Sequence, residues 1–426
     1  MATKANYGDK TNMVQMAAGL FMYHLRRKSV INHLVGKMPK DIENAKTWQT
    51  SRYMPIIRAA DLHKGQGDEV AFNLMNPVSA YPVMGGEYAE GRGTGMSMAE
   101  DRLRVNQARF PLDLGDTMTT LRSPVDYRKA GRPVAQDLMD RYCDQSLLVH
   151  LAGARGFHNN VEWCVPLETD PRYRNVVVNP VKAPTKNRHF VSQGDGVVSV
   201  KNNSGELDIA STSLFTMELV DTMKDVLDNM PLPPPNIIVD EDVSAKSDPL
   251  RVWLVSPSQY NHFANDPRFR RYQAEAHARA SQAKNHPLFL GECGIWKGFL
   301  IKKMPYPIRF YAGDEIKYCA DTTSETESVV KVPASFKDGG GFAIDRSIIL
   351  GGQALAEAFG SRGTNETPFF WSEKKLDHDD KMELLIGTIR GVKKIRFNRN
   401  IGGGQHEWVD NGVIAVDTVV ALNGSR

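Results

Sequence analysis

The sequence predicts a mixed fold of helices and strands, arranged in two or more subdomains. The chain has 426 residues, 41% of them hydrophobic, so it can bury a substantial core and is long for one compact unit. Segments with helical spacing of apolar residues occur beside segments in which apolar and polar residues alternate. The run PLPPP at 231–235 makes a stiff connector, which predicts a subdomain boundary.

The overall composition narrows the class of protein. Lys plus Arg is 53 against 50 for Asp plus Glu, so any contact with a polyanion must be local. Cys143, Cys164, Cys293 and Cys319 form no C-x-x-C pair, which argues against zinc or a disulfide framework and fits a reducing compartment. The apolar stretch MVQMAAGLFMYHL is too short to span a bilayer, so we expect a soluble protein without membrane contact.

Three helices are predicted before the boundary. Residues 11–36 carry apolar side chains at helical spacing and predict an amphipathic N-terminal helix or pair of helices. A long helix is expected over 133–152, because proline is tolerated at a helix start. A second amphipathic helix is expected over 213–230, with Ser213 able to cap it.

Strands are predicted on both sides of a glycine-rich run and again in the second half. Alternation predicts strands at 68–74 and 102–114. Between the helices the chain is rich in loops, with NVVV (175–178) and HFV (189–191) as short strand candidates. After the boundary the predicted strands are RVWLVSP, FLIKKM, IRFYAG, IGTIRGVKKIRF and GVIAVDTVV, the last two joined through the loop IGGG. SIILGGQALAEAFG predicts strand, turn and helix, and 270–284 a polar helix.

The run GGEYAEGRGTGMSM, residues 85–98, admits two interpretations. Its five glycines are Gly85, Gly86, Gly91, Gly93 and Gly95. Glycine lets backbone N–H groups approach a phosphate, but a phosphate loop should follow a strand and lead into a helix. Here the glycines lead into a strand and no G-K-[ST] follows. The connection is also far longer than a usual hairpin loop, which favours a projecting arm with a pliable tip.

Two clusters of charged residues are candidates for binding. Arg390, Lys393, Lys394 and Arg396 lie in strand alternation, which predicts one buried face and one positive face. They are candidates for contact with DNA or a neighbouring subunit, although a solvated strand face or a salt-bridge surface is favoured. The acidic stretch at 377–380 lacks calcium-loop spacing, so an exposed charged turn is favoured over a metal site.

No catalytic signal occurs in this long chain. The sequence has no G-x-S-x-G, H-E-x-x-H or Walker motif, so we assign no catalytic, cofactor or metal residues. What remains is an amphipathic arm, a glycine-rich projection, a long central helix and a proline-bounded second subdomain. Arms and loops that lie over neighbouring copies bury surface between subunits, so these features favour self-assembly.

The chain also resembles the major capsid proteins of tailed bacteriophages, in the branch typified by the N-four podovirus coat protein. The resembling segments, in order, are DLHKGQGDEVAFNLMNPVS, LAGARG, APTKNRHFVSQGD, VWLVSPSQY, HPLFLGECGIWKGFLI, IGTIRGVKKIRF and GVIAVDTVV. They span most of the chain from about 61 to 420. Their order and spacing together are more specific than any one of them.

The resemblance implies the Hong Kong 97 type of capsid fold, an α+β architecture. Mapped onto this sequence, it implies an N-terminal arm (1–60), an extended loop (61–112), the first part of a peripheral domain (113–235), an axial domain (236–384) and closing strands of the peripheral domain (385–426). The glycine-rich run would be the tip of a loop that lies across an adjacent subunit. The spine helix would be 133–152.

The resemblance further implies a non-enzymatic shell protein. Hexamers and pentamers of this chain would tile an icosahedral container for double-stranded DNA, assembled in the host bacterial cytoplasm and located in the virion capsid. Scaffolding, portal and decoration proteins would be partners, and packaged DNA would be contacted without sequence specificity. The alternatives are another virion structural protein of the tail tube type and a soluble α/β enzyme with a glycine-rich phosphate loop.

Overall fold

The fold is seen in a computed structural model. It describes residues 34–35, 53–59, 69–75, 82–93, 95–96, 98–116, 127–158, 162–194, 196–238, 250–270, 294–338, 341–360, 368–402 and 405–422. Apart from residues 34–35 and 270, the predicted N-terminal helix (11–36) and the predicted polar helix (270–284) lie outside these ranges.

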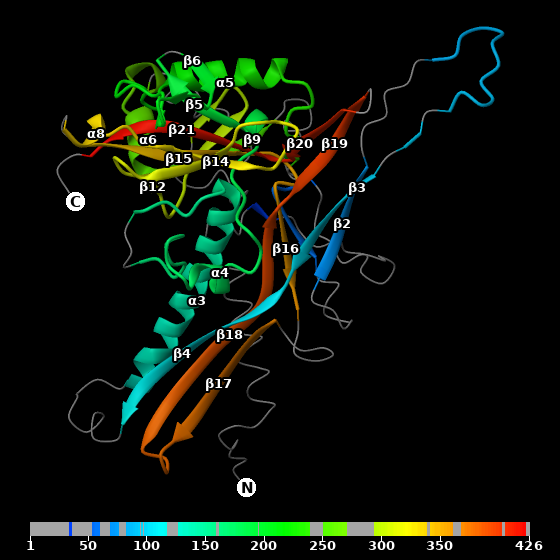
Figure 1. The fold of residues 1–426 in the computed structure, drawn as a ribbon. Coiled ribbons are helices and arrows are strands. Elements are labelled where there is room, and N and C mark those ends of the chain that lie inside the picture. Colours follow the sequence, from blue (N-terminus) through cyan, green and yellow to red (C-terminus); the bar gives the residue numbers. More distant parts are fainter. Residues whose placement is uncertain are drawn as a thin grey trace.

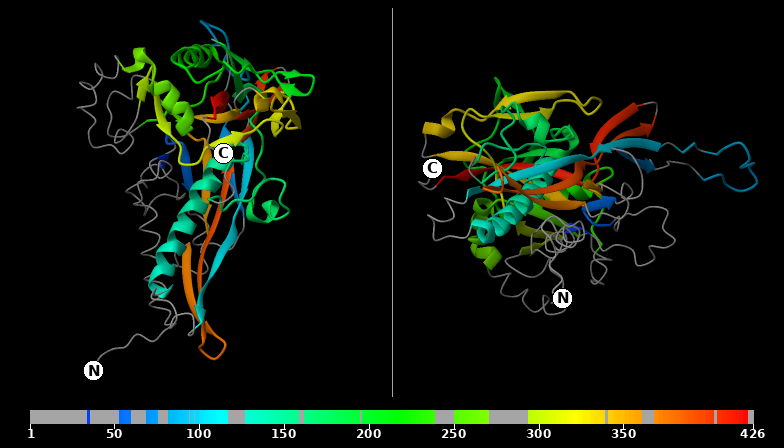
Figure 2. Two further views of the ribbon diagram at one scale, coloured as in Figure 1. Left: turned by 90° about the vertical axis from the view of Figure 1, so that its left-hand side faces the viewer. Right: turned by 90° about the horizontal axis from the view of Figure 1, so that it is seen from below.

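A five-stranded sheet and one long helix form the elongated lower half of the molecule in Figure 1. The strands are β1 (Ile56–Ala59), β4 (Asn106–Asp116), β16 (Leu355–Phe359), β17 (Phe369–Leu376) and β18 (Lys381–Lys394). β18 is the centre: β4 pairs with it on one edge, and β17 and β16 pair with successive parts of it. The views in Figure 2 show the helix α3 (Tyr127–Ala152) lying along this sheet.

The upper half is built on an eight-stranded sheet in the order β10-β11-β9-β15-β21-β5-β6, with β12 pairing β15. Its strands are β5 (His189–Gln193), β6 (Gly196–Ser199), β9 (Arg251–Val255), β10 (Gly294–Trp296), β11 (Phe299–Lys303), β12 (Ile308–Phe310), β15 (Phe342–Leu350) and β21 (Val413–Ala421). Helices α5 (Met217–Asn229) and α6 (Pro257–Ala264) pack on it through a second apolar cluster that contains Trp253 and Phe263.

Smaller elements complete the description. A four-stranded sheet contains β13 (Glu315–Cys319), β14 (Glu327–Lys331), β8 (Glu206–Leu207) and β7 (Asn202–Asn203). Two hairpins pair β2 (Glu69–Met75) with β3 (Met98–Arg104) and β19 (Arg396–Gly402) with β20 (Gln405–Asp410). The short helices are α4 (Tyr173–Val176), η3 (Lys186–Arg188) and α8 (Ser335–Asp338).

The two large sheets combine the chain differently from the predicted division. β16 and β17 lie within residues 236–384 yet belong to the same sheet as β18, whereas β21 at the end of the chain joins the eight-stranded sheet. β5 and β6 also join that sheet from before the proline run. This arrangement depends on pairing between strands that are far apart in the sequence, and local sequence patterns do not predict such pairing.

Most predicted elements are present, with three corrections in their type. Residues 355–359 form a strand and not a helix, because all five are buried between β1 and β18, where tertiary pairing overrides the helix propensity of Leu, Ala and Glu. NVVV does not form a strand, since Asn175 and Val176 end the short helix α4. β19, which ends at Gly402, pairs with β20 in a hairpin that the sequence prediction missed.

Helix boundaries need two corrections. α3 begins at Tyr127, and Pro133 lies inside it on the solvent-exposed side, where water can hydrate the carbonyl left without a donor. The helix ends as predicted before Gly153, whose φ of +66° favours glycine. α5 is capped by Thr216 and not by Ser213: Leu219 N–H donates to the Thr216 hydroxyl at 3.3 Å.

Candidate assembly surface

A β hairpin projects from the body of the molecule. β2 and β3 pair antiparallel from Glu69 opposite Arg104 to Met75 opposite Met98, and the segment beyond them extends away from both large sheets in Figure 1. The strands predicted around the glycine-rich run are therefore present. Because the run leads into β3 and not into a helix N-terminus, the geometry needed to hold a phosphate is lacking.

The tip of this hairpin, residues 82–98, is exposed at its described positions, which are 82–93, 95–96 and 98. A methyl group added at Gly85, Gly86, Gly91, Gly93 or Gly95 would meet no atom within 4 Å. Gly85 and Gly91 have φ values of +63° and +79°, so only these two need glycine for their backbone conformation. The other three glycines lie in open space, which leaves room for a second molecule to approach.

The tip carries large apolar side chains that the sequence interpretation overlooked. Tyr88 is 82% exposed and Met84 72%, and Met96 and Met98 are exposed as well. Exposed apolar side chains gathered on one projection are typical of an interaction surface. Contact between apolar side chains and water is unfavourable, and a bound partner would exclude that water. A tyrosine and three methionines within one glycine-rich loop were the signal that could have found it.

The predicted positive strand face is wrong for three of its four members. Arg390, Lys394 and Arg396 are buried, and each pairs with a carboxylate of the same chain. They are therefore unavailable for contact with DNA or another subunit. The alternation in sequence was read correctly as strand, but the face expected to meet solvent is covered by other parts of the fold.

Lys394 and Arg396 share one buried carboxylate. Lys394 Nζ lies 2.8 Å from Asp410 Oδ2, and Arg396 Nε lies 2.7 Å from Oδ1. Burial alone would raise the pKa of Asp410, but the two cations and their hydrogen bonds outweigh it and lower the pKa to about 2. Burial lowers the pKa of Lys394 to about 8. The charge of Asp410 opposes this shift, and the charge of Arg396 adds to it. This cluster joins β18, β19 and β20 from inside.

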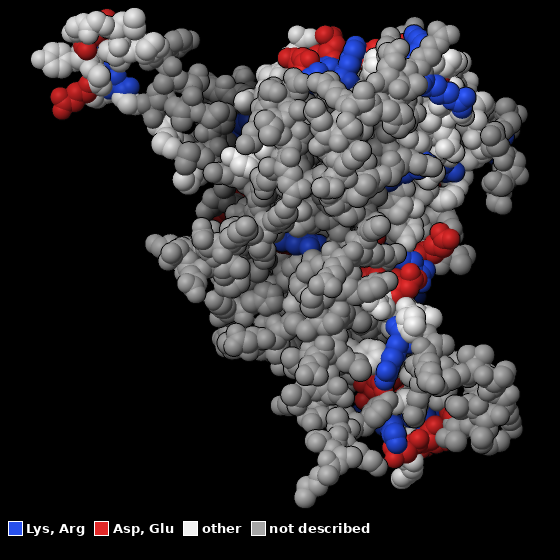
Figure 3. All heavy atoms as spheres, turned by 180° about the vertical axis from the view of Figure 1, so that it is seen from behind, with Lys and Arg blue, Asp and Glu red and all other residues white. Residues whose placement is uncertain are grey.

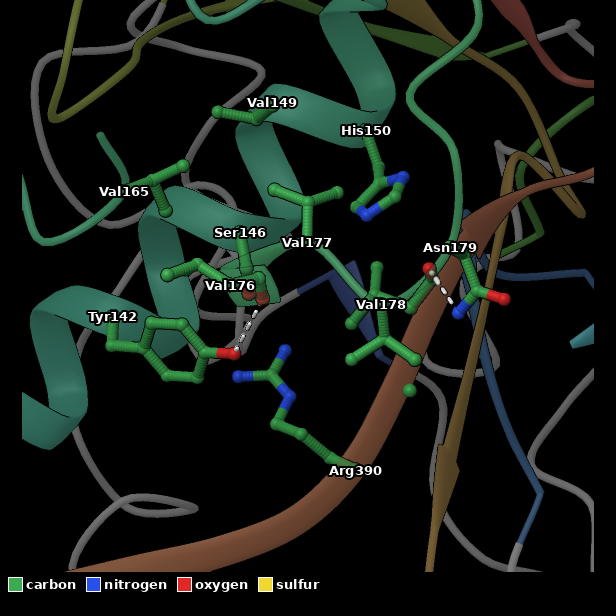
Figure 4. A pocket seen from close by; sticks show the side chains of 12 residues that line it. Tyr142, Ser146, Val149, His150, Val165, Val176, Val177, Val178, Asn179 and Arg390 are labelled. Atoms are coloured by element: carbon green, nitrogen blue, oxygen red, sulfur yellow. Dashed lines mark hydrogen bonds between the residues drawn. The ribbon is translucent and has the colours of Figure 1, made fainter. Parts of the chain in front are cut away.

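Arg390 reaches a small cavity between α3 and β18. Figure 4 shows its guanidinium directed toward Tyr142 and Ser146 on the helix, with His150 one turn further along. The cavity has a volume of about 20 Å³, enough for one water molecule but not for a substrate. Burial, followed by the charges of Arg390, Lys394 and Lys393, lowers the pKa of His150 to about 3. These groups stabilise the contact between helix and sheet.

Lys393 is the fourth member and points the other way. Its ammonium group forms an ion pair with Asp101 and donates to the carbonyl of Arg102 at 2.8 Å. Both partners belong to β3, so this side chain holds the base of the projecting hairpin. Figure 3 shows that the described acidic and basic residues on the far face lie side by side without a large patch of one sign.

The described residues contain no cluster of potential metal ligands. The acidic turn at 377–380 is exposed and joins β17 to β18, with Asp377, His378 and Asp379 at positive φ. No group of three potential ligands gathers in the described ranges. Within those ranges, no helix is long and apolar enough to cross a bilayer.

The family model described as phage capsid protein matches residues 4–422. The chain belongs to the phage capsid protein family. Membership makes it a structural component of a bacteriophage capsid and not an enzyme, as the sequence predicted. It also supports the predicted role of major capsid protein. No curated protein sequence matches the chain.

Solved capsids show the same fold as this phage capsid protein. The capsid of Ralstonia phage GP4 is 20% identical with a TM-score of 0.65, over 88% of this chain and 90% of the other. The Cyanophage Pam1 capsid is 16% identical with a TM-score of 0.52, over 86% and 88%. The acidic stable capsid of Helicobacter pylori bacteriophage KHP30 is 13% identical with a TM-score of 0.54, over 87% and 88%. The predicted α+β fold of the Hong Kong 97 type is confirmed.

Proposed function

We propose that this phage capsid protein forms hexamers and pentamers that tile an icosahedral shell around double-stranded DNA. The observation that carries this proposal is the projecting hairpin, whose tip exposes Met84, Tyr88 and Met96. In a closed shell each tip lies across an adjacent copy, and these side chains become buried. Weak contacts of this kind become strong when symmetry repeats them.

The proposal extends to the regions and partners around the shell. The half built on α3 serves as the peripheral domain, the eight-stranded sheet as the axial domain, and residues 1–60 as an arm. The family branch is that of the N-four podovirus coat protein, and assembly takes place in the host cytoplasm with scaffolding, portal and decoration proteins. The buried positions of Arg390, Lys394 and Arg396 direct the search for DNA contacts to other surfaces.

Substitutions at the tip test the proposal. The variant Met84→Ser/Tyr88→Ser/Met96→Ser removes apolar surface from exposed positions, so the subunit folds with its wild-type unfolding midpoint. Shell yield, measured by sedimentation velocity and electron microscopy, falls strongly. The matched control Glu87→Gln/Arg92→Gln alters an exposed ion pair of the same tip and keeps the wild-type yield. Equal yields of closed shells from both variants would overturn the role of the tip.

A further inference from the structure

On the β3 side, the projecting hairpin joins the body through a single residue. β3 pairs with β2 as far as Arg104, and β4, which starts at Asn106, pairs with β18. Val105 between them belongs to neither strand. The chain therefore exchanges one strand partner for another within one residue, and nothing in the β2–β3 pairing itself fixes the direction in which the hairpin points.

Asn179 holds the hairpin at this point. This residue follows α4 and is buried. Arg104 N–H donates to Asn179 Oδ1 at 2.9 Å, and Asn179 Nδ2 donates to the Arg104 carbonyl at 2.8 Å. The same amide nitrogen donates to the Val392 carbonyl at 3.1 Å, and Figure 4 shows Asn179 beside β18. One side chain thus ties the last residue of the hairpin to the central strand of the sheet.

Neighbouring contacts place the hairpin base against β18. Leu103 is fully buried, and Lys393 pairs with Asp101. Gly391 lets the two backbones approach, because a methyl group there would lie 2.0 Å from the Arg104 carbonyl oxygen. Lys393 and Leu103 supply attraction, and the Asn179 amide both donates to and accepts from the backbone of Arg104. A pair of opposed hydrogen bonds to the N–H and the carbonyl of one residue fixes orientation as well as distance.

We propose that Asn179 is the positioning residue that sets the direction of the projecting hairpin relative to the five-stranded sheet. The inference rests on the proposed function for its biological role, since a fixed direction delivers the exposed tip to one place on a neighbouring copy. The Asn179 hydrogen bonds themselves lie within one subunit. Without the Asn179 bonds, rotation at Val105 spreads the hairpin over a range of directions while both large sheets stay folded.

The test measures the direction of the hairpin in the unassembled subunit. Spin labels are attached through non-canonical amino acids at Met98, the outer end of the paired strands, and at Asp228 on α5, so all native cysteines remain. Double electron–electron resonance gives a narrow distance distribution for the parent protein and a broadened or displaced one for Asn179→Ala. The control Asn411→Ala removes an amide that bonds to Gln353 and keeps the parent distribution.

A second variant decides the matter if Asn179→Ala does not fold. Asn179→Asp keeps an acceptor for the Arg104 N–H and nearly the same volume, but loses both donated bonds, so it also broadens the distribution. Parent-like distributions in the folded Asn179 variants would overturn the proposal, as would a broad distribution in the parent protein. The distance measurement uses the unassembled subunit. Its result therefore does not depend on whether the wild-type chain assembles into shells.

Discussion

Arg390 on β18 and Glu357 on β16 form a buried ion pair in which Nη2 lies 2.9 Å from Oε1. Arg58 on β1 shares the same carboxylate, with its Nε 2.7 Å from Oε2. One acidic side chain therefore links three strands of the five-stranded sheet. The arrangement explains why Arg390 can be buried although the sequence pattern favoured exposure, because the carboxylate of Glu357 balances its charge.

Removing this carboxylate charge is expected to destabilise the subunit strongly. Glu357→Gln keeps the volume but leaves Arg58 and Arg390 without their shared anion, and breaking a buried pair costs about 3–5 kcal/mol. Urea unfolding of the unassembled subunit measures the loss. The control Asp170→Asn removes the partner of the exposed Arg172 and leaves the unfolding midpoint unchanged. The account of Arg390 fails if the two variants have the same midpoint.

Stability is expected to fall between pH 7 and pH 5 because of His150. Its pKa of about 3 in the folded protein lies below the value of about 6.5 in the unfolded chain. The unfolded state therefore binds more protons in this window, and stability decreases as the pH falls. Burial and the charges of Arg390, Lys393 and Lys394 hold the imidazole neutral.

His150→Leu tests this pH dependence. The imidazole accounts for about 2 kcal/mol of stability lost between pH 7 and pH 5, and the variant lacks that part of the loss. Urea unfolding at the two pH values gives the difference. His406→Leu, at an exposed position on β20, keeps the wild-type dependence. An unchanged slope in His150→Leu would mean that the imidazole is not held neutral.

The corrected helix cap is testable by a pair of hydroxyl deletions. Thr216→Ala removes the acceptor for Leu219 N–H and costs about 1 kcal/mol. Ser213→Ala removes a buried hydroxyl that has no hydrogen-bond partner in the described structure, so it is neutral or slightly stabilising. Thermal unfolding of both variants distinguishes the two caps. A larger loss for Ser213→Ala would restore the residue that the sequence pattern favoured.

The sequence predicted those features that depend on local patterns. Strands such as β9 and β21 are mostly apolar, and the flanks of the glycine-rich run alternate, so these strands are predictable from the local sequence. Residues 355–359 were read as a helix because their propensity is helical, and only the pairing with β1 and β18 reverses it. The sequence prediction was wrong where the structure of a segment depends on a strand that is distant in the sequence.

The assembly surface was predicted in outline and missed in detail. The length and glycine content of residues 85–98 predicted a projection, but the exposed Tyr88, on which the proposed contact depends, was not part of that prediction. The basic run was misread because Glu357 and Asp410 are distant in sequence and reach it only through the fold. Asn179 had no local signal, since a single asparagine in a loop is ordinary.

Electron microscopy of the purified full-length chain, with and without a candidate scaffolding protein, tests the central claim most directly. The account predicts closed icosahedral shells or rings of five and six copies, and their loss in Met84→Ser/Tyr88→Ser/Met96→Ser. Light scattering on the same samples gives the mass. A monomer or small dimer under every condition, or open tubes in place of shells, would contradict it.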